Sequence, residues 1–310
     1  MNVTGQYWFS RGYGAMLEVF RDRRRSRSGA ADAGANIAGA VLWLFRRVSV
    51  FPSDAATGAC VRAAVIIPAR LASSRLPGKL LLELAGKPII QHVYERAMRA
   101  LRAHRRSALS LQNSERIRDV VEGFGGEAVM TRPEHQSGSE RIAEAAAQFG
   151  ETCDVIVNVQ GDEPEIDPAN IDALIETQGH IGGFASTLAC AFPEGLDPQD
   201  PAAVKVILGR RLVGAPQTYD GLYFTRAHAP FPRDGAGEFH LHIGVYAFSP
   251  QSLMAFAGTQ PSRLERIERL EQLRILEMGE RIAVRIVAAT APGIDTQADF
   301  DRARARFGGD

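Results

Sequence analysis

The sequence has few cysteines, no long apolar segment and no excess of either charge. Cys60, Cys153 and Cys190 lie far apart and form no CxxC pair, which argues against a disulfide framework or a zinc site and indicates a reduced, intracellular protein. The apolar stretch "NIAGAVLWLF" has only ten residues, about half of what a membrane span needs. Because the formal net charge is +0, a general nucleic-acid binder is not indicated either.

The remaining composition is that of a globular protein. Of the 310 residues, 45% are hydrophobic and 23% charged, which suits one large domain or two small ones. Residues 1–62 stand apart, with nine arginines against four acidic residues. This extension reads as a disordered basic tail, as an Arg-rich targeting segment or as translated sequence upstream of the true start. We therefore predict a folded domain over 63–310.

From residue 63 onward, short apolar runs alternate with longer amphipathic stretches. Strands are predicted at 63–69, 127–131, 154–160, 184–190, 203–209, 221–227, 242–249 and 281–287. Helices are predicted at 87–101, 137–149, 168–178, 262–279 and 296–307. The order in the first half predicts an α/β fold whose sheet is mixed but mostly parallel, with helices on both faces.

The loop after the first apolar run combines a glycine turn with basic residues. In "ARLASSRLPGK", Gly78 lets the main chain approach a ligand closely, and Arg70, Arg75 and Lys79 supply positive charge. The pattern is neither a Walker A loop nor a GxGxxG fingerprint, so the residues alone leave both phosphate binding and ordinary turn chemistry open. The second Gly-Lys pair, in "AGKP", is more typical of a turn into a helix.

Two further loops that follow predicted strands carry acidic residues. Asp162 lies in "NVQGDEPEIDP" and Asp295 in "APGIDTQADF". Ligands of open α/β sheets bind beyond the carboxyl ends of the strands, and Mg²⁺ takes hard oxygen ligands such as carboxylates. The alternatives are a solvated loop acid for Asp162 and a helix cap for Asp295. Two carboxylates beside a basic glycine loop suit nucleotidyl transfer, which needs positioning and charge neutralisation rather than a protein nucleophile.

Several of these motifs together resemble a known family. The resemblance is carried by "VIIPARLASSRLPGK", "HQSGSER", "VNVQGDEP", "LYFTRAHAPFPRD", "HIGVYAF" and "PGIDTQADF". In this order they resemble the CMP-Kdo synthetases, the 3-deoxy-manno-octulosonate cytidylyltransferases. The resemblance implies a Rossmann-like nucleotidyltransferase fold with a smaller sugar-binding and dimerisation subdomain. It also implies CMP transfer from CTP to the 2-hydroxyl of Kdo with release of pyrophosphate, Mg²⁺ as cofactor, and a cytoplasmic homodimer in lipopolysaccharide inner-core synthesis.

The family's nucleotide-binding and catalytic roles transfer onto matching positions. The resemblance assigns catalytic roles to Arg70, Lys79, Asp162 and Asp295, of which the two aspartates are also the implied Mg²⁺ ligands. The implied nucleotide contacts come from two motifs and are Ser74, Arg75, Gln136, Ser137 and Gly138. Ser137 also starts a helix capping box with the glutamate three residues later, and both roles can coexist.

The implied sugar contacts all lie in the second half of the chain: Gln160, Arg226, His242, Glu265 and Gln272. Arg226 would bind the Kdo carboxylate in a bidentate manner, and the alternative is a surface arginine. His242 reads equally well as a satisfied core histidine. On a single helix over 262–279, Glu265, Glu268 and Gln272 fall within roughly 60°, facing either sugar hydroxyls or solvent with arginine salt bridges.

One segment departs from the family pattern. Residues 101–114 read "LRAHRRSALSLQNS" where the family has an apolar strand followed by Ala-Thr-Asp, although "SALSLQ" is still predicted as a weak strand. Three other functions therefore remain as alternatives. They are a cytidylyltransferase for a related sugar acid such as 8-amino-Kdo, a catalytically impaired nucleotide-binding relative, and a nucleic-acid-binding protein with a basic N-terminal arm.

Overall fold

The computed structural model describes residues 61–308 apart from 72, 74, 101–106, 113, 136, 150–152 and 236. Nearly all of the predicted extension lies outside these residues, as do Ser74 and Gln136. Arg62, which the predicted boundary assigns to the extension, contacts the folded domain. Its main-chain N–H donates to Asp154 Oδ2 at 2.8 Å, and its guanidinium pairs with the same carboxylate. No helix among the described residues is long and apolar enough to cross a membrane.

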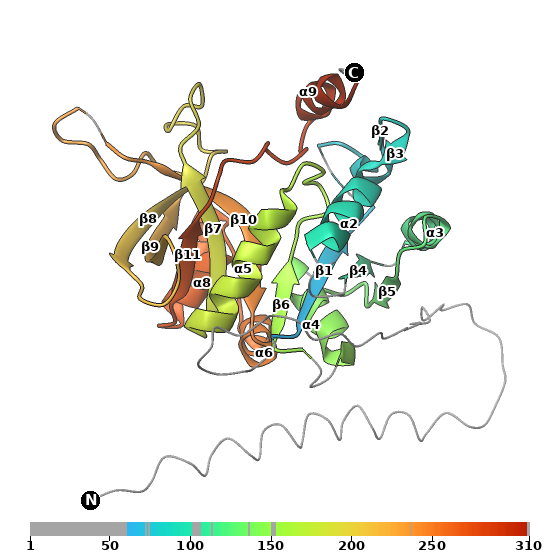
Figure 1. The fold of residues 1–310 in the computed structure, drawn as a ribbon, viewed down its shortest axis with the longest axis horizontal. Helices are drawn as coiled ribbons and strands as arrows, with labels where there is room; N and C mark the ends of the chain where they lie inside the picture. The colour runs from blue at the N-terminus through green and yellow to red at the C-terminus, as the bar shows by residue number, and fades with distance from the viewer. Residues whose placement is uncertain are drawn as a thin grey trace, which may run out of the picture. The chain divides into compact units, whose positions relative to one another are not determined.

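The described residues form a nine-stranded mixed sheet in the order β5-β4-β1-β6-β10-β7-β11-β9-β8 (Figure 1). The strands are β1 (Ala63–Ala69), β4 (Ser107–Gln112), β5 (Ala128–Thr131), β6 (Val155–Asn158), β7 (Ala185–Ala191), β8 (Lys205–Arg211), β9 (Thr218–Thr225), β10 (His240–Phe248) and β11 (Ile282–Ile286). Strands β1, β4, β5 and β6 pair in parallel with one another, as predicted. Pairing in the second half is mostly antiparallel, because short connections such as the β8–β9 turn can join only antiparallel neighbours.

Helices cover both faces of this sheet, as predicted. They are α2 (Ile89–Ala100), α3 (Glu115–Gly123), α4 (Gly138–Phe149), α5 (Pro168–Ile181), α6 (Pro250–Gly258) and α9 (Gln297–Phe307). Buried residues of α2 and α5 form one core with Val65 and Ile67 of β1, whereas those of α4 and α6 form a second core with Ala64 and Ile66. Successive side chains of β1 therefore enter opposite cores, which explains why the strand is apolar throughout.

The atypical segment forms a strand, which confirms the prediction for "SALSLQ". Strand β4 lies between β1 and β5 and is parallel to both, with Ser107 opposite Val65 and Leu109 opposite Ala128. Pairing on both sides satisfies the main-chain groups of β4, and this compensates for a side-chain pattern that is weak for a strand. Strand β1 thus keeps the central neighbour that the parallel sheet requires.

The prediction of a single helix over 262–279 is wrong. Two short helices occur instead, α7 (Arg263–Glu268) and α8 (Gln272–Glu277), and between them Arg269 has a left-handed φ of 52°. On a continuous helix, Glu265 and Arg274 would lie about 180° apart, because nine residues turn by about 900°. The break brings the two side chains together in a buried ion pair. This tertiary contact overrides the helical periodicity of the sequence.

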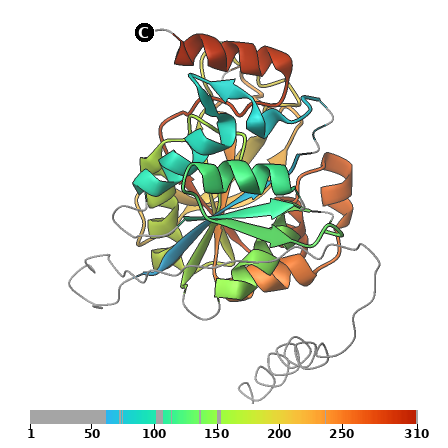
Figure 2. The ribbon, with the colours of Figure 1, turned by 90° about the vertical axis from the view of Figure 1, so that its right-hand side faces the viewer.

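The second Gly-Lys pair forms a turn before a helix, as predicted. Ala85 and Gly86, with φ of 47° and 74°, connect the short strands β2 (Glu83–Leu84) and β3 (Lys87–Pro88). This hairpin leads directly into α2 and lies beside α9 (Figures 1 and 2). Its lysine pairs with Glu95 of α2 at 2.9 Å.

Candidate active site

Three loops meet beyond the sheet and converge on one lysine. Lys79 opens a short 3-10 helix after β1, Asp162 follows β6, and Asp295 directly precedes the N-cap of α9. The Lys79 ammonium donates to Asp162 Oδ2, to Asp295 Oδ1 at 3.0 Å and to the Ile294 carbonyl at 3.1 Å. Three of the four residues with predicted catalytic roles therefore lie together. In sequence, Asp162 and Asp295 are 83 and 216 residues away from Lys79.

Main-chain packing holds these loops together. The Ile294 N–H donates to the Asp162 carbonyl at 2.9 Å. A Cβ at Gly293 would lie 3.4 Å from that carbonyl, and a Cβ at Gly161 would lie 3.0 Å from the Pro68 carbonyl. A side chain at Gly161 would thus push the β6 loop away from the β1 loop. Neither glycine is among the predicted site residues, and the signal for them is their position one residue before Asp162 and two residues before Asp295.

The side chain of Asp295 faces the basic residues and does not cap the helix. Thr296 is the N-cap of α9 and forms a reciprocal capping box with Asp299, so the cap interpretation of Asp295 is wrong. Its carboxylate contacts Lys79 through Oδ1 and the exposed Arg75 guanidinium through Oδ2, at 3.1 Å. This carboxylate is about half exposed, at 49%, and is therefore open to a ligand.

The charge balance favours a protonated lysine. Burial by itself lowers the pKa of Lys79, but the charges and hydrogen bonds of Asp162 and Asp295 outweigh it, and the pKa is raised. Next to this cluster, desolvation raises the pKa of the Glu163 carboxyl to about 8, with a further contribution from the charge of Asp162. Lys79 and Arg75 together thus balance the charges of the two carboxylates, and the neighbouring glutamic acid is mostly neutral at pH 7.

The two aspartates fit a magnesium ion that is shared with a phosphate ligand. Asp162 Oδ2 and Asp295 Oδ1 surround the same Lys79 nitrogen and are hard oxygen donors. The described residues contain no group of three or more His, Cys, Asp or Glu side chains that could hold a metal by themselves. Mg²⁺ is usually bound by only one or two carboxylates together with waters and substrate phosphates, and these two side chains match that requirement.

Two further arginines lie close to one another. Arg70 is exposed immediately after β1, and Arg141 of α4 is buried at 6% exposure. Burial lowers the pKa of Arg141, and the positive charge of Arg70 lowers it further. Arg141 donates to the carbonyls of Arg132 and His135, which fixes its position. This buried arginine is not among the predicted residues, although it ends the "HQSGSER" motif.

The start of α4 combines a cap with open space. The Ser137 hydroxyl accepts a hydrogen bond from the Glu140 N–H at 3.2 Å, so its predicted cap role is confirmed. A Cβ on Gly138 would meet no atom within 4 Å, so the main chain there is accessible to a ligand. The next residue, Ser139, donates through its hydroxyl to Glu271 at 2.6 Å. This hydrogen bond ties the predicted nucleotide loop to the turn between α7 and α8.

The predicted sugar contacts that follow β9 and β6 are already engaged in the protein. Arg226 donates through Nε to the Glu268 carbonyl and through Nη1 to the Pro201 carbonyl, both at 2.8 Å. The Nη2 group makes no hydrogen bond to the described residues. Gln160 donates to the Gly244 carbonyl at 3.4 Å. Their contact with a sugar stays a prediction.

His242 has the environment of a core histidine. Its Nε2 lies 3.0 Å from the Thr187 hydroxyl, and its ring packs edge-on against Phe224 with centroids 4.9 Å apart. Because the Thr187 hydroxyl donates to the Val245 carbonyl at 2.7 Å, the histidine Nε2 is the donor in this pair. Desolvation lowers the pKa of His242 to about 3, so the ring is neutral at physiological pH.

The expected polar stripe of Glu265, Glu268 and Gln272 does not exist on the broken helix. Both carboxylate oxygens of Glu265 accept from Arg274, and one also accepts from the Ser262 N–H at 2.9 Å within the predicted capping box. Gln272 is 4% exposed, and its side-chain nitrogen has no hydrogen-bond partner among the described residues. Of the two predicted sugar contacts, only Gln272 therefore has a donor still to be satisfied.

Known proteins resemble this chain in sequence and in fold. The family model described as Cytidylyltransferase matches residues 64–282. The chain is 42% identical over 253 residues to the 3-deoxy-manno-octulosonate cytidylyltransferase of Rhodopirellula baltica, which covers 78% of this chain and 97% of the relative. It is 41% identical over 240 residues to the 8-amino-3,8-dideoxy-manno-octulosonate cytidylyltransferase of Shewanella sediminis, with coverage of 76% and 94%.

Among solved structures, CMP:2-keto-3-deoxy-manno-octonic acid synthetase complexed with CTP is similar, with a TM-score of 0.73 and 37% identity. The match covers 80% of this chain and 99% of that one. The fold, the site and these matches all lead to one assignment. The chain belongs to the cytidylyltransferase family.

Proposed function

We propose that this nucleotidyltransferase transfers CMP from CTP to 3-deoxy-manno-octulosonate (Kdo) and releases pyrophosphate. The observation that carries the proposal is the cluster in which Lys79 meets Asp162 and Asp295, with Arg75 and Arg70 exposed nearby. Two relatives that match this chain over almost their whole length are named for this reaction. An intact cluster of this kind also argues against a catalytically impaired relative.

The basic residues would hold the triphosphate and stabilise the leaving group. The 2-hydroxyl oxygen of the sugar bonds to the α-phosphorus and releases its proton to solvent, and the bond from that phosphorus to the bridging oxygen of the β-phosphate breaks. Negative charge then develops on the departing pyrophosphate, and Lys79, Arg75 and Arg70 are placed to neutralise it without rearrangement of solvent. Mg²⁺, when bound by Asp162 and Asp295, would supply further neutralisation of phosphate charge.

The aspartates and the lysine have complementary roles in this scheme. Without substrate, Lys79 pairs with both carboxylates and Arg75 pairs with that of Asp295, which keeps the three loops together. An incoming triphosphate offers the ammonium and Arg75 new acceptors, and this releases carboxylate oxygens for the cation that accompanies CTP. The site thus exchanges one set of ion pairs for another.

The direct test is pyrophosphate release from CTP, with and without Kdo, in the presence of Mg²⁺. We expect release that requires both substrates, and we expect Asp162→Asn to abolish it while the far-UV circular dichroism stays unchanged. Asp234→Asn is the matched control, because Asp234 is exposed in a loop. A folded chain that binds CTP but releases no pyrophosphate with Kdo would contradict the proposal.

A second candidate substrate is 8-amino-Kdo, since the relatives named for the two sugars are 41% and 42% identical to the chain. Running the same assay with both sugars would separate them by their ratio of kcat/KM.

We further propose that the enzyme is a cytoplasmic homodimer that serves lipopolysaccharide inner-core synthesis. The proposal is supported by large apolar side chains that are exposed in the single chain and that association would bury: Val213, Leu222, Phe231 and Ile267. Light scattering after size-exclusion chromatography would report the mass, and a monomer at micromolar concentration would argue against the dimer.

A further inference from the structure

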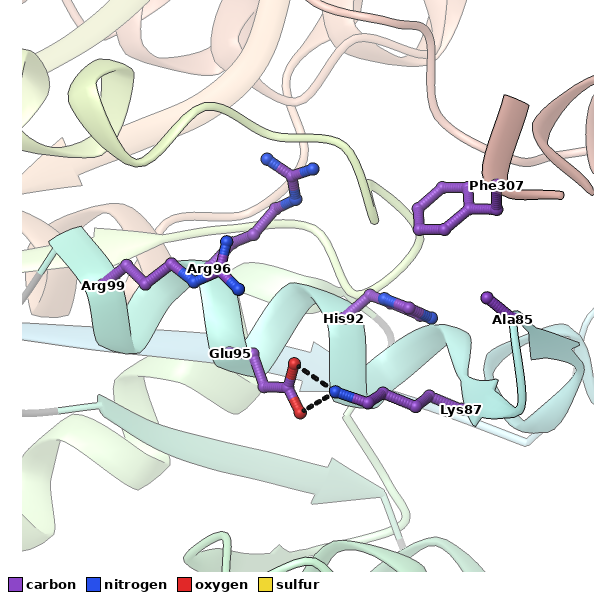
Figure 3. Close-up of a pocket in the computed structure, with 7 residues that line it drawn as sticks. All are labelled: Ala85, Lys87, His92, Glu95, Arg96, Arg99 and Phe307. Carbon is purple, nitrogen blue, oxygen red and sulfur yellow. Dashed lines mark hydrogen bonds and ion pairs between the residues drawn. The ribbon is translucent and has the colours of Figure 1, made fainter. Parts of the chain in front are cut away.

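A cavity of about 330 Å³ lies on the outer face of α2 and shares no residue with the cluster around Lys79. It is lined by Ala85, Lys87, His92, Glu95, Arg96, Arg99 and Phe307 (Figure 3). Four of these residues lie on α2 with spacings of three and four, which places them on one face of the helix. The opposite face is buried in the core through Ile89, Val93 and Ala97. The β2–β3 hairpin and the end of α9 supply the other walls.

The lining of this cavity carries an excess of positive charge. Glu95 is the only acidic residue of the lining, and both of its oxygens accept from the Lys87 ammonium at 2.9 Å. Lys87 thereby balances the charge of Glu95, and no other acidic residue of the lining balances the charges of Arg96 and Arg99. Within the described part of the chain, neither arginine forms an ion pair. Arg96 donates only to the Ile166 carbonyl, at 3.3 Å.

Aromatic and main-chain contacts fix the walls of the cavity. His92 Nε2 lies 2.8 Å from the Leu84 carbonyl, and it must be the donor because a carbonyl oxygen can only accept. The His92 ring also packs edge-on against Phe307, with centroids 4.7 Å apart. The hairpin, α2 and α9 are thus joined around the cavity.

We propose that this cavity binds a small phosphate-bearing anion between Arg96 and Arg99. Two guanidinium groups one helical turn apart present several N–H donors in a geometry that suits phosphate oxygens. The volume lies at the lower end of the range for ligand pockets, which suits inorganic pyrophosphate or a nucleoside monophosphate better than a large cofactor. The site is distinct from the one proposed for CTP, and its occupation does not depend on turnover.

Occupation of this cavity would also order α9. Phe307 is the last residue of that helix, and the helix begins next to Asp295. A ligand that bridges α2 and the end of α9 would therefore reduce hydrogen exchange in α9, and this readout does not require catalysis.

The test is isothermal titration of the chain with inorganic pyrophosphate, in a Lys79→Met background that weakens the primary phosphate site. We expect binding to persist in this background and to weaken at least tenfold in Arg96→Gln/Arg99→Gln. Arg96→Lys/Arg99→Lys should fall between, because lysine keeps the charge but lacks the planar fork. A charge-matched control is Arg211→Gln/Arg233→Gln, since both arginines are exposed elsewhere, and it should bind as the background does.

CMP in a parallel titration separates free phosphate from nucleotide as the source of the phosphate group. Loss of pyrophosphate binding alone in Arg96→Gln/Arg99→Gln would assign the site to inorganic phosphate compounds, and loss of both would include nucleotides. The proposal is overturned if the Lys79→Met background binds neither probe, or if Arg96→Gln/Arg99→Gln binds them as tightly as the control pair. Unchanged thermal midpoints of the variants exclude loss of binding through unfolding.

Discussion

The buried ion pair between Glu265 and Arg274 gives the sharpest prediction about stability. The side chain of Arg274 is 2% exposed and that of Glu265 is 10% exposed. Arg274 also donates to the Thr259 carbonyl at 2.9 Å and lies 4.7 Å from the centre of the Phe256 ring. Removing one partner leaves the other charge buried and uncompensated, which costs about 3–5 kcal/mol. Glu265→Gln and Arg274→Met should each lower the free energy of unfolding by an amount in this range.

The double variant separates the ion pair from the packing around it. Glu265→Gln/Arg274→Met removes both charges, so its loss should be smaller than the sum of the single losses by about 1–3 kcal/mol. Urea unfolding followed by circular dichroism measures all three values. Additive losses, or single losses under about 1 kcal/mol as for an exposed pair, would refute the assignment of a buried, coupled pair.

The same variants decide how Glu265 acts in catalysis. If Glu265 serves only to hold α7 against α8, both single variants should change the KM for Kdo together with stability. If Glu265 contacts the sugar directly, Glu265→Gln should raise the KM for Kdo much more than Arg274→Met does. The structure favours the first outcome, since both oxygens of Glu265 are engaged within the protein.

Other side chains give outcomes that can be measured separately. Lys79→Met should slow pyrophosphate release by about 100-fold or more, because a preorganised charge at the leaving group is lost. The pKa of His242 is lowered from 6.5 to about 3, so its contribution to stability is present above pH 6.5 and is lost as the pH falls toward 3, by at most about 1.4 kcal/mol per pH unit. His242→Gln should therefore flatten the acid limb of stability against pH in urea unfolding. Ser139→Ala should cost about 1–2 kcal/mol in unfolding free energy, since it leaves Glu271 without its hydroxyl donor, and should raise the KM for CTP.

Each of these outcomes has a clear opposite. Turnover at the normal rate in Lys79→Met would remove this lysine from the reacting centre. An unchanged acid limb in His242→Gln would mean that the ring is protonated in the folded protein. An unchanged unfolding free energy and KM in Ser139→Ala would show that the link between α4 and the α7–α8 turn does not position the nucleotide loop.

The sequence by itself determined the elements whose signal is local. The apolar run at 63–69 and the amphipathic pattern at 87–101 predict β1 and α2, because a strand buried on both faces and a helix buried on one face require those periods. The turn at Gly86 and the caps at Ser137 and Ser262 are equally local, since each depends on residues within a few positions. The family motifs also pointed to Lys79 and the two aspartates before any distance was known.

Only the tertiary structure decided which distant residues meet and which partners they take. Periodicity predicts one helix over 262–279, whereas the structure has two. The break allows Glu265 and Arg274 to form a buried ion pair, because a straight helix would hold these two residues on opposite sides. The weak pattern of β4 becomes a strand because β1 and β5 satisfy its main chain on both sides. Asp295 turns from the helix toward Lys79 because the next residue takes the cap. The buried ion pair, the pairing of β4 and the contact of Asp295 with Lys79 each join separate elements, and no local pattern encodes them.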